Sequence, residues 1–222
     1  MNLILNRPRT PIRANQSLPM ALNPDERAAM IGTAAGLISE LLDVLRIDHR
    51  DDHNTRETPE RVARMLVEEL LAGRFNPPPA ITAFDNVSGF DQLLVTGPIA
   101  VRSTCAHHLM PIHGEAFIGV LPSASGSIIG LSKYDRIVDH FASRLQIQEE
   151  LVKQIGQFIM DRTQPCGLAV RISANHLCKT HRGVRAGERG RMITTTYFGA
   201  FDHDLELRRD FQRECLAFGQ TG

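Results

Sequence analysis

IAVRSTCAHHLMP, residues 99 to 111, joins a predicted strand to a cluster of metal-binding side chains. Its first five residues have the apolar and β-branched character of a strand. Cys105 and His108 follow in a Cys-x-x-His spacing, and Cys178 offers a second thiolate much later in the chain. Two Cys and one His are three ligands, the number with which a catalytic zinc site keeps its fourth position free for water. The pattern therefore predicts an open metal site at the end of a strand.

Two further imidazoles lie beside these ligands. His107 directly precedes His108, and His176 stands two residues before Cys178, just after a strand predicted over residues 168–173. Imidazole moves protons in neutral solution, so both are candidates for acid–base catalysis. The alternative is that the Cys side chains are small buried hydrophobes and the His side chains are structural. A second His/Cys pair in a chain with only four Cys favours the metal site.

The composition bounds the possible partners. In 222 residues, 42% are hydrophobic and 23% charged, which is ordinary for a globular protein with a packed core. The 25 basic and 25 acidic residues cancel, which argues against non-specific binding to nucleic acid or membrane. The four Cys do not resemble the disulfide framework of a small secreted protein. Since no apolar run is long enough for a transmembrane helix, we expect a cytoplasmic protein.

Three segments are predicted. Residues 1–22 mix Arg and Pro, contain no acidic residue and lack the apolar centre of a signal peptide, so we expect a flexible arm. Residues 23–78 form a helical section, with helices that begin at Asn23-Pro24 and at Thr58-Pro59, each a polar cap followed by proline. Three consecutive prolines then break the chain, and residues 79–222 form the catalytic domain.

Within residues 79–222 the hydrophobic period changes from that of helices to that of strands. Helices are predicted from Ser132, over 148–162 and over 205–218, and Gly114 and Gly119 are interpreted as bulges. The strands are expected at 81–84, 93–95, 99–103, 112–121, 168–173 and 192–201. Strands in groups, separated by a helix pair, indicate an α+β fold with an antiparallel sheet.

Three clusters suit a nucleotide. Lys133 and Arg136 lie three residues apart at a predicted helix start, where free backbone N–H groups also favour anions; the alternative is a solvated pair. Residues 181–185, His-Arg-Gly-Val-Arg, are too short for a nucleic-acid stripe and match a compact polyanion. Glu149, after Gln148, can accept two N–H bonds from a guanine-like edge, or can simply favour the positive end of a helix.

In this order, the motifs resemble the GTP cyclohydrolase I family over residues 25–215. They are Cys-x-His-His at 105–108, Gly-Leu-Ser-Lys-x-x-Arg at 130–136, Gln-Glu at 148–149 and His-x-Cys-x-x-x-Arg-Gly at 176–183. The resemblance implies a T-fold, in which an antiparallel sheet carries a helix pair on one face. It also implies a homodecamer of two face-to-face pentamers, with active sites at subunit borders. The reaction would convert GTP and water to 7,8-dihydroneopterin triphosphate and formate, for folate and pterin biosynthesis.

The resemblance also implies a role for each candidate residue. Cys105, His108 and Cys178 would hold zinc, whose water attacks C8 of the purine. His107 would protonate the imidazole nitrogen as the ring opens, and His176 would assist the later rearrangement and closure.

The remaining candidates would contact GTP. Ser132 would lie near the ribose, and Glu149 with Gln148 would read the guanine edge. The triphosphate would be bound by Lys133, Arg136 and Arg182, together with Arg61 of a neighbouring subunit.

Two alternatives stay open. Ala106 replaces a Glu that the family usually has between the Cys and the His pair, so a divergent homologue that stops at a ring-opened formamidopyrimidine is one. The other is a non-enzymatic protein in which His181 completes a closed Cys₂His₂ zinc site. The all-His zinc site of pterin synthases and the zinc-free Cys of the related nitrile reductase do not match the Cys/His/Cys set.

Overall fold

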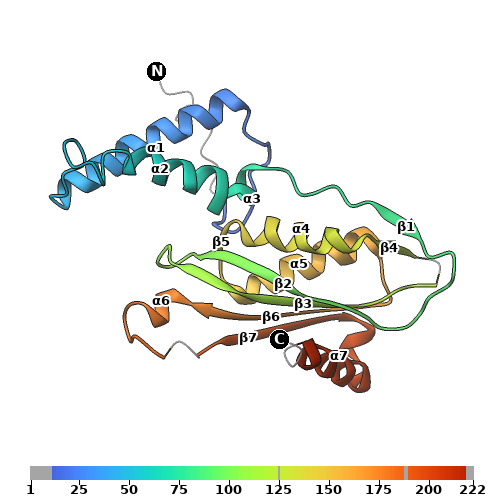
Figure 1. The fold of residues 1–222 in the computed structure, drawn as a ribbon. Helices are drawn as coiled ribbons and strands as arrows, with labels where there is room; N and C mark the ends of the chain where they lie inside the picture. Colours follow the sequence, from blue (N-terminus) through green and yellow to red (C-terminus); the bar gives the residue numbers. More distant parts are fainter. Residues whose placement is uncertain (1–11, 125, 188–189, 219–222) are drawn as a thin grey trace. The chain divides into compact units, whose positions relative to one another are not determined.

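The structure is a computed structural model that describes residues 12–124, 126–187 and 190–218. It contains two compact units, one that ends at Pro77 and one that begins at Pro78. The first unit is helical and the second contains every strand of the described chain, as Figure 1 shows.

The helical unit starts with α1 (Pro24–Val44), whose N-terminus has a complete capping box. The Asn23 side chain accepts a hydrogen bond from the Glu26 backbone at 2.9 Å, and the Glu26 carboxylate accepts one from the Asn23 backbone at 3.0 Å. Two backbone donors that a helix start leaves unpaired are thereby satisfied. The cap predicted from Asn23-Pro24 is confirmed.

The second helical segment is less regular than the sequence pattern predicts. α2 (Thr58–Arg64) continues through a π-helical turn, η2 (Met65–Leu70), into α3 (Ala72–Phe75), and α1 packs against α2. Glu57 occupies the N-cap without a side-chain hydrogen bond, so the prediction of Thr58 as the cap is wrong. The proline at the second helical position starts the helix without help from a cap.

Part of the stretch predicted as a flexible arm is hydrogen-bonded to the α3 turn. Residues 1–11 lie outside the described residues. Ser17 donates to the Gly73 carbonyl at 2.7 Å, and the Leu18 backbone donates to the Arg74 carbonyl at 2.8 Å. The Arg74 guanidinium also donates to three carbonyls of residues 13–16. Composition alone does not reveal these contacts, because backbone carbonyls make them.

The second unit is built on a five-stranded sheet in the order β5-β2-β3-β6-β7. Its strands are β2 (Leu94–Cys105), β3 (Pro111–Leu121), β5 (Leu145–Gln146), β6 (Gly167–His176) and β7 (Met192–Gly199). All neighbours are antiparallel except β2 and β5. A separate two-stranded sheet pairs β1 (Ala83–Asp85) with β4 (Ser127–Ile129).

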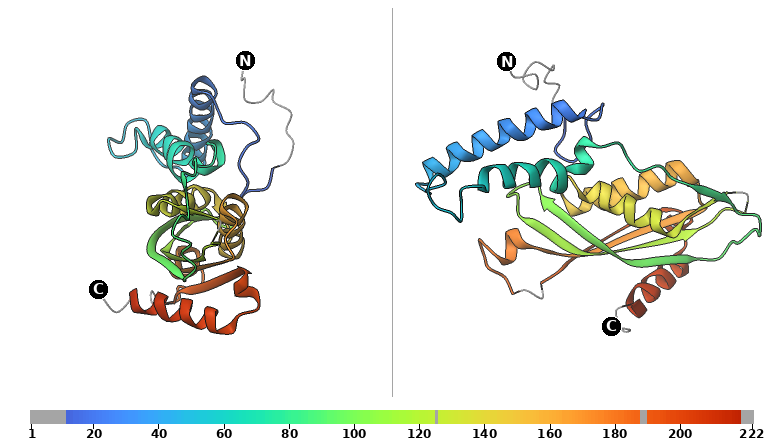
Figure 2. Two further views of the ribbon diagram at one scale, coloured as in Figure 1. Left: turned by 90° about the vertical axis from the view of Figure 1, so that its right-hand side faces the viewer. Right: turned by 45° about the horizontal axis from the view of Figure 1, so that its top comes forward.

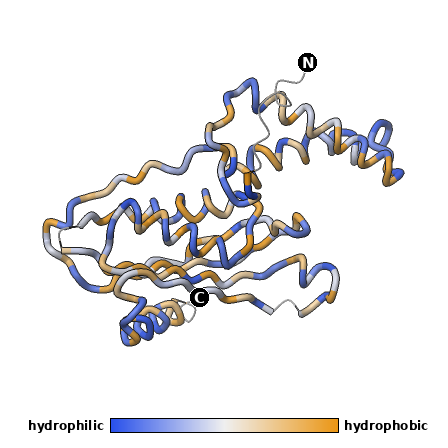
Figure 3. Tube along the Cα trace, turned by 180° about the vertical axis from the view of Figure 1, so that it is seen from behind, coloured by the Kyte–Doolittle hydropathy of each residue, from blue (hydrophilic) through white to orange (hydrophobic). Residues whose placement is uncertain are grey.

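Helices cover both faces of the sheet. α4 (Leu131–Ala142) and α5 (Gln148–Thr163) pack on one face, which confirms the predicted helix pair of an α+β fold. α7 (Leu205–Phe218), which follows a 3-10 turn, η3 (Ala200–Asp202), packs on the opposite face (Figure 2). α7 is largely hydrophilic along its trace (Figure 3), so only a narrow apolar side, with Phe211, enters the core.

Alternation along β3 supplies both cores. Ala116, Ile118 and Val120 belong to the larger cluster beneath α4 and α5, whereas Phe117 belongs to the smaller cluster with Phe211. This is the two-residue period of a strand, expressed with apolar side chains on both sides.

The glycines of β3 are explained by close packing, and the bulges predicted there are wrong. Gly114 and Gly119 pair in register with both neighbouring strands. A Cβ on Gly114 would lie 2.1 Å from the Ser173 carbonyl oxygen, and one on Gly119 would lie 2.5 Å from the Phe211 ring. The register shift lies instead between Thr96 and Ile99 of β2. The sequence pattern predicts two separate strands here, at 93–95 and 99–103.

A buried histidine in α4 introduces a sensitivity to acid. His140 is 8% exposed, and the Arg144 guanidinium donates to its Nε2 at 2.7 Å. Because a guanidinium has no acceptor, Nε2 must be unprotonated. Burial, followed by the charge of Arg144, lowers the pKa of His140 to about 4.

We expect His140 to destabilise the fold progressively as the pH falls from about 6.5 to about 4, because unfolded histidine then binds a proton that the folded protein excludes. The free energy of unfolding in urea, measured at both ends of this range, should fall by about 3 kcal/mol more in the wild type than in His140→Gln. Glutamine keeps an acceptor for Arg144 but does not titrate. Parallel pH profiles for the two proteins would contradict the assignment.

Candidate metal centre

Cys105 and His108 are held by a tight turn at the end of β2. Cys105 is the last residue of the strand, and its backbone N–H donates to the Met110 carbonyl at 2.8 Å. Its carbonyl accepts from the Leu109 backbone at 2.9 Å, with Leu109 in the left-handed region at φ 54°. The Ala106 backbone donates to the Gln146 carbonyl of β5 at 3.0 Å. The backbone of the turn is thus fixed by its own hydrogen bonds and by a neighbouring strand.

Cys178 is placed by the end of β6. His176 is the last residue of that strand, and the single helical turn α6 (Leu177–Thr180) carries Cys178. Ile112 of β3 pairs with Ser103 on one side and with His176 on the other. Cys105 and Cys178 therefore each follow, by two residues, a strand residue that pairs with Ile112 of the central strand.

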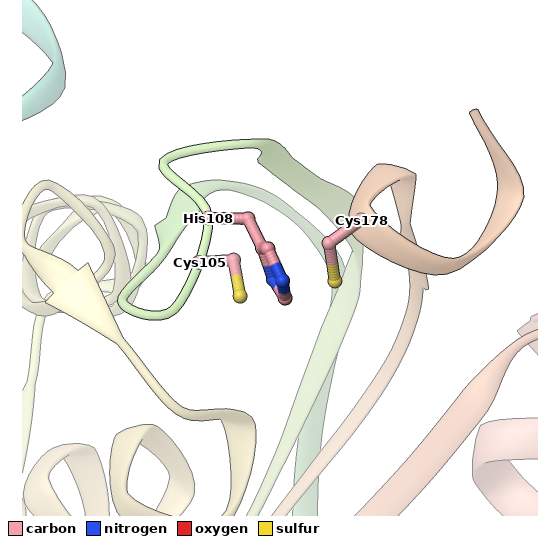
Figure 4. Close-up of side chains that lie close together, drawn as sticks. All are labelled: Cys105, His108 and Cys178. Atoms are coloured by element: carbon pink, nitrogen blue, oxygen red, sulfur yellow. The ribbon is translucent and has the colours of Figure 1, made fainter. Parts of the chain in front are cut away.

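The three predicted ligands come together. The ligand atoms of Cys105, His108 and Cys178 all lie within 4.8 Å of one another (Figure 4). Zinc binds Cys sulfur at about 2.3 Å and His nitrogen at about 2.0 Å, so ligand atoms on a shared tetrahedron lie about 3.5 to 4 Å apart. A set of two thiols and one imidazole at this spacing fits a metal such as zinc, which such donors select.

The thiols differ in their surroundings. Cys105 is 4% exposed, whereas Cys178 is half-buried. Burial, followed by the hydrogen bond and charge of Cys105, raises the pKa of the Cys178 thiol, and the positive charge of Arg182 opposes that shift. Since a metal binds the thiolate, its binding must release the proton that this neighbourhood retains.

The two additional imidazoles flank this group in different ways. His107 is exposed, and its Nδ1 lies 3.8 Å from the Cys105 sulfur. His176 is half-buried, and its Nε2 lies 2.7 Å from the Gln148 side-chain oxygen. Burial lowers the pKa of His176, while Glu149 opposes this shift and Lys179 adds to it. Glu149 itself is exposed at the start of α5, close enough for its charge to act on that ring.

His181 does not join the metal group. Among the residues that the structure describes, the only group of potential ligands within reach of one ion is the Cys105, His108 and Cys178 set. His181 caps the C-terminus of α6 and is exposed. The geometry therefore favours three protein ligands over a closed Cys₂His₂ site.

The candidate residues for binding the nucleotide lie in separate parts of the structure. Ser132, Lys133 and Arg136 lie in the first turns of α4, whereas the end of α4 leads to β5, whose Gln146 pairs with Cys105. At about 1.5 Å per residue, Lys133 lies about 14 Å and Arg136 about 9 Å along the helix axis from the end of α4 that leads to β5. Figure 1 shows β4, which precedes α4, and α6 at opposite ends of the sheet.

The other two arginines differ again. Arg182 follows α6, and its charge acts on Cys178. Arg61 lies on α2 in the helical unit, where it is exposed and forms an ion pair with Glu57. Sequence reasoning also missed Thr194 of β7, which accepts a hydrogen bond from the buried Gln148 amide at 3.0 Å. A threonine in a strand gives no sign of such a contact.

None of the described helices is long and apolar enough to cross a membrane.

The model of the family described as GTP cyclohydrolase I matches residues 34–215. A GTP cyclohydrolase 1 from Shewanella denitrificans is 37% identical over 89% of this chain and 88% of its own length. The Salmonella choleraesuis protein of that name is 36% identical over 92% and 88%, and the Streptomyces coelicolor one 42% identical over 68% and 75%. The solved archaeosine synthase QueF-Like aligns with 50% of this chain at 14% identity and a TM-score of 0.38, so the fold class rests on the sheet order above.

We expect Cys178→Ser to lose bound zinc, because two remaining ligands and a weak hydroxyl cannot replace the thiolate. Metal content after dialysis against a mild chelator is the measurement. Cys166→Ser, at an exposed Cys outside the group, is the matched control and should retain full stoichiometry. His181→Ala should retain it as well. Full zinc in Cys178→Ser, or loss of zinc in His181→Ala, would contradict the three-ligand assignment.

Proposed function

The chain belongs to the GTP cyclohydrolase I family, and we propose that it opens the purine ring of GTP by hydrolysis and releases formate. The final product would be 7,8-dihydroneopterin triphosphate, which serves folate and pterin biosynthesis. The observation that carries the proposal is the meeting of Cys105, His108 and Cys178, with His107 in contact with the Cys105 sulfur and His176 two residues before Cys178. We expect the enzyme to act in the cytoplasm.

Zinc is the metal we assign to the three ligands. When bound, it supplies a water molecule that ionises near neutral pH and acts as the nucleophile for hydrolysis. Cys105 and Cys178 would hold it as thiolates and His108 as a neutral imidazole, three protein ligands that would leave a position free for water. The hydrogen bonds of the turn after β2 keep two of these ligands in place, so little reorganisation is needed on binding.

His107 is our candidate for the acid of ring opening. As water adds to C8 and the bond from C8 to the imidazole nitrogen breaks, that nitrogen needs a proton, which His107 donates. Its contact with the Cys105 sulfur places the ring beside the metal position, and its exposure lets solvent return the proton. His176, on the other strand end, is the candidate for the later rearrangement and closure, with Ser132 near the ribose.

The nucleotide itself would be held by charge. Glu149, exposed at the N-terminus of α5, suits the paired N–H groups of a guanine edge. Lys133, Arg136, Arg182 and Arg61 are the cations for the triphosphate. Because Lys133 and Arg136 are separated by half of α4 or more from the helix end that leads to β5 and Cys105, we propose that the metal group of one chain works with the α4 cations of a neighbour.

A ring of subunits would bring the metal group of one chain next to the α4 cations of its neighbour. β7 forms one edge of the sheet, and at the other edge the two-residue β5 covers only the end of β2. Long open edges are sites where another chain can pair. We propose that copies join edge to edge into pentamers and that two pentamers form a homodecamer.

One substitution favours a second candidate function. Ala106 lies between two ligands and has no carboxylate to support the neighbouring imidazoles, so catalysis could end at the ring-opened formamidopyrimidine. Formate release without a fluorescent pterin after oxidation would identify that enzyme, and both products together would identify the complete reaction.

We expect the zinc-loaded wild type to release formate from GTP, and His107→Ala to keep its zinc while losing ring opening by about a hundredfold or more. His113→Ala, at an exposed His of β3, is the control and should remain active. Formate release at the wild-type rate from His107→Ala would exclude it as the acid.

A shared site makes a separate prediction. Cys178→Ser and Lys133→Ala should each be inactive alone, yet co-expression at equal levels should restore about a quarter of wild-type activity. In a random mixture, about half of the sites have an intact metal group, and about half of those also have an intact Lys133 from the neighbour. Mixed assemblies can be isolated through different tags on the two chains. Mixed assemblies without any activity would show that a single chain supplies both parts.

A further inference from the structure

Gln148 is a polar side chain that is almost completely buried at the start of α5. It is the first residue of α5 and only 1% exposed. Its amide nitrogen donates to the Ile172 carbonyl at 3.1 Å, to the Met192 carbonyl at 3.0 Å and to Thr194 Oγ1 at 3.0 Å. These acceptors belong to β6 and β7, so the side chain fastens the start of α5 to two adjacent strands.

The chemistry of these partners fixes which way the amide points. Carbonyl oxygens only accept hydrogen bonds, so the group that faces Ile172 and Met192 must be the NH₂. A reversed amide would place its oxygen against two other oxygens, with both NH₂ hydrogens directed elsewhere. The orientation therefore follows from the surroundings, which is the proper basis for assigning an amide.

This orientation determines the proton position on a neighbouring ring. The remaining atom of the amide, Oε1, lies 2.7 Å from His176 Nε2. Since Oε1 only accepts, Nε2 must carry the hydrogen, and in the neutral ring Nδ1 is then the acceptor. Among the described residues, this contact with Gln148 is the one hydrogen bond of the His176 ring.

We infer that Gln148 is a positioning residue that holds His176 as the Nε2–H tautomer and presents Nδ1 as an acceptor to a donor group of the nucleotide after its ring has opened. The inference rests on the proposed function for its substrate and on the hydrogen bonds alone for the tautomer. It gives Gln148 a task other than reading guanine, because both ends of its amide already bind groups of the protein.

The tautomer can be observed directly. In the zinc-loaded protein labelled with ¹⁵N-histidine, sedimented for solid-state NMR, His176 should give a pyrrole-type Nε2 and a pyridine-type Nδ1 signal. His176→Gln identifies its signals among those of the nine histidines. An Nδ1–H tautomer in the wild type would overturn the inference, whether or not any variant folds and whether or not the protein turns over GTP.

Two variants test the cause. Gln148→Met keeps the length of the side chain but offers no acceptor, so His176 should become a mixture of tautomers. Thr194→Val is the matched control: it removes one anchor of the amide but leaves the two carbonyls and the bond to His176, so one tautomer should persist. An unchanged tautomer in Gln148→Met would overturn the inference.

Kinetics separate positioning from guanine recognition. Gln148→Met should lower kcat by about tenfold to a hundredfold, the usual effect of losing a residue that orients a site, and leave KM for GTP unchanged. A raised KM with unchanged kcat would mean that Gln148 binds the base, and would overturn the inference. Absence of formate from the wild type would instead refute the proposed function, while the tautomer measurement would stand.

Discussion

The metal centre depends on the register of the central strand. Ile112 pairs with Ser103 of β2 and with His176 of β6, and a thiol follows each partner by two residues, Cys105 at the end of β2 and Cys178 in α6. A slip by one residue would turn alternate side chains to the other face and separate the ligands. Gly114 holds the register on one side, because the β6 backbone approaches so closely that no Cβ fits. A packing constraint in the sheet thus becomes a constraint on metal coordination.

The metal ligands are also separated from two of the cations that would bind the triphosphate. The metal ligands gather where β2 and β6 end, whereas Lys133 and Arg136 lie in the first half of α4, away from the helix end that leads to β5. If a neighbouring chain completes the site, then catalysis depends on assembly, and sheet edges that are open within one chain serve to pair with the next.

Sequence patterns predicted the features that one segment determines by itself. Helix α7 has its predicted bounds, Asn23 caps α1, and the Cys-x-x-His spacing puts Cys105 and His108 on one turn, where the predicted third ligand, Cys178, joins them. Features that need a partner were missed. The sequence predicts two strands within β2, because Gly97-Pro98 interrupts the strand pattern. In the structure, β2 pairs with β3 on both sides of this interruption.

The site shows the same limit. The family resemblance assigns Gln148, with Glu149, to the guanine edge. That the Gln148 amide instead meets two strand carbonyls depends on how α5 packs on β6 and β7. Such contacts leave no periodic signal in the sequence.

An amide is well suited to the position beside His176, and the reason is electrostatic. A buried carboxylate would also accept from Nε2, but it would face the carbonyls of Ile172 and Met192 with no hydrogens to offer them. It would also add a buried charge, at a large desolvation cost, close to Glu149 and two metal-binding thiols. A polyanionic nucleotide would then approach an even more negative site. A neutral amide fixes the ring without adding charge, which leaves the electrostatic potential of the site to the metal and to the cations.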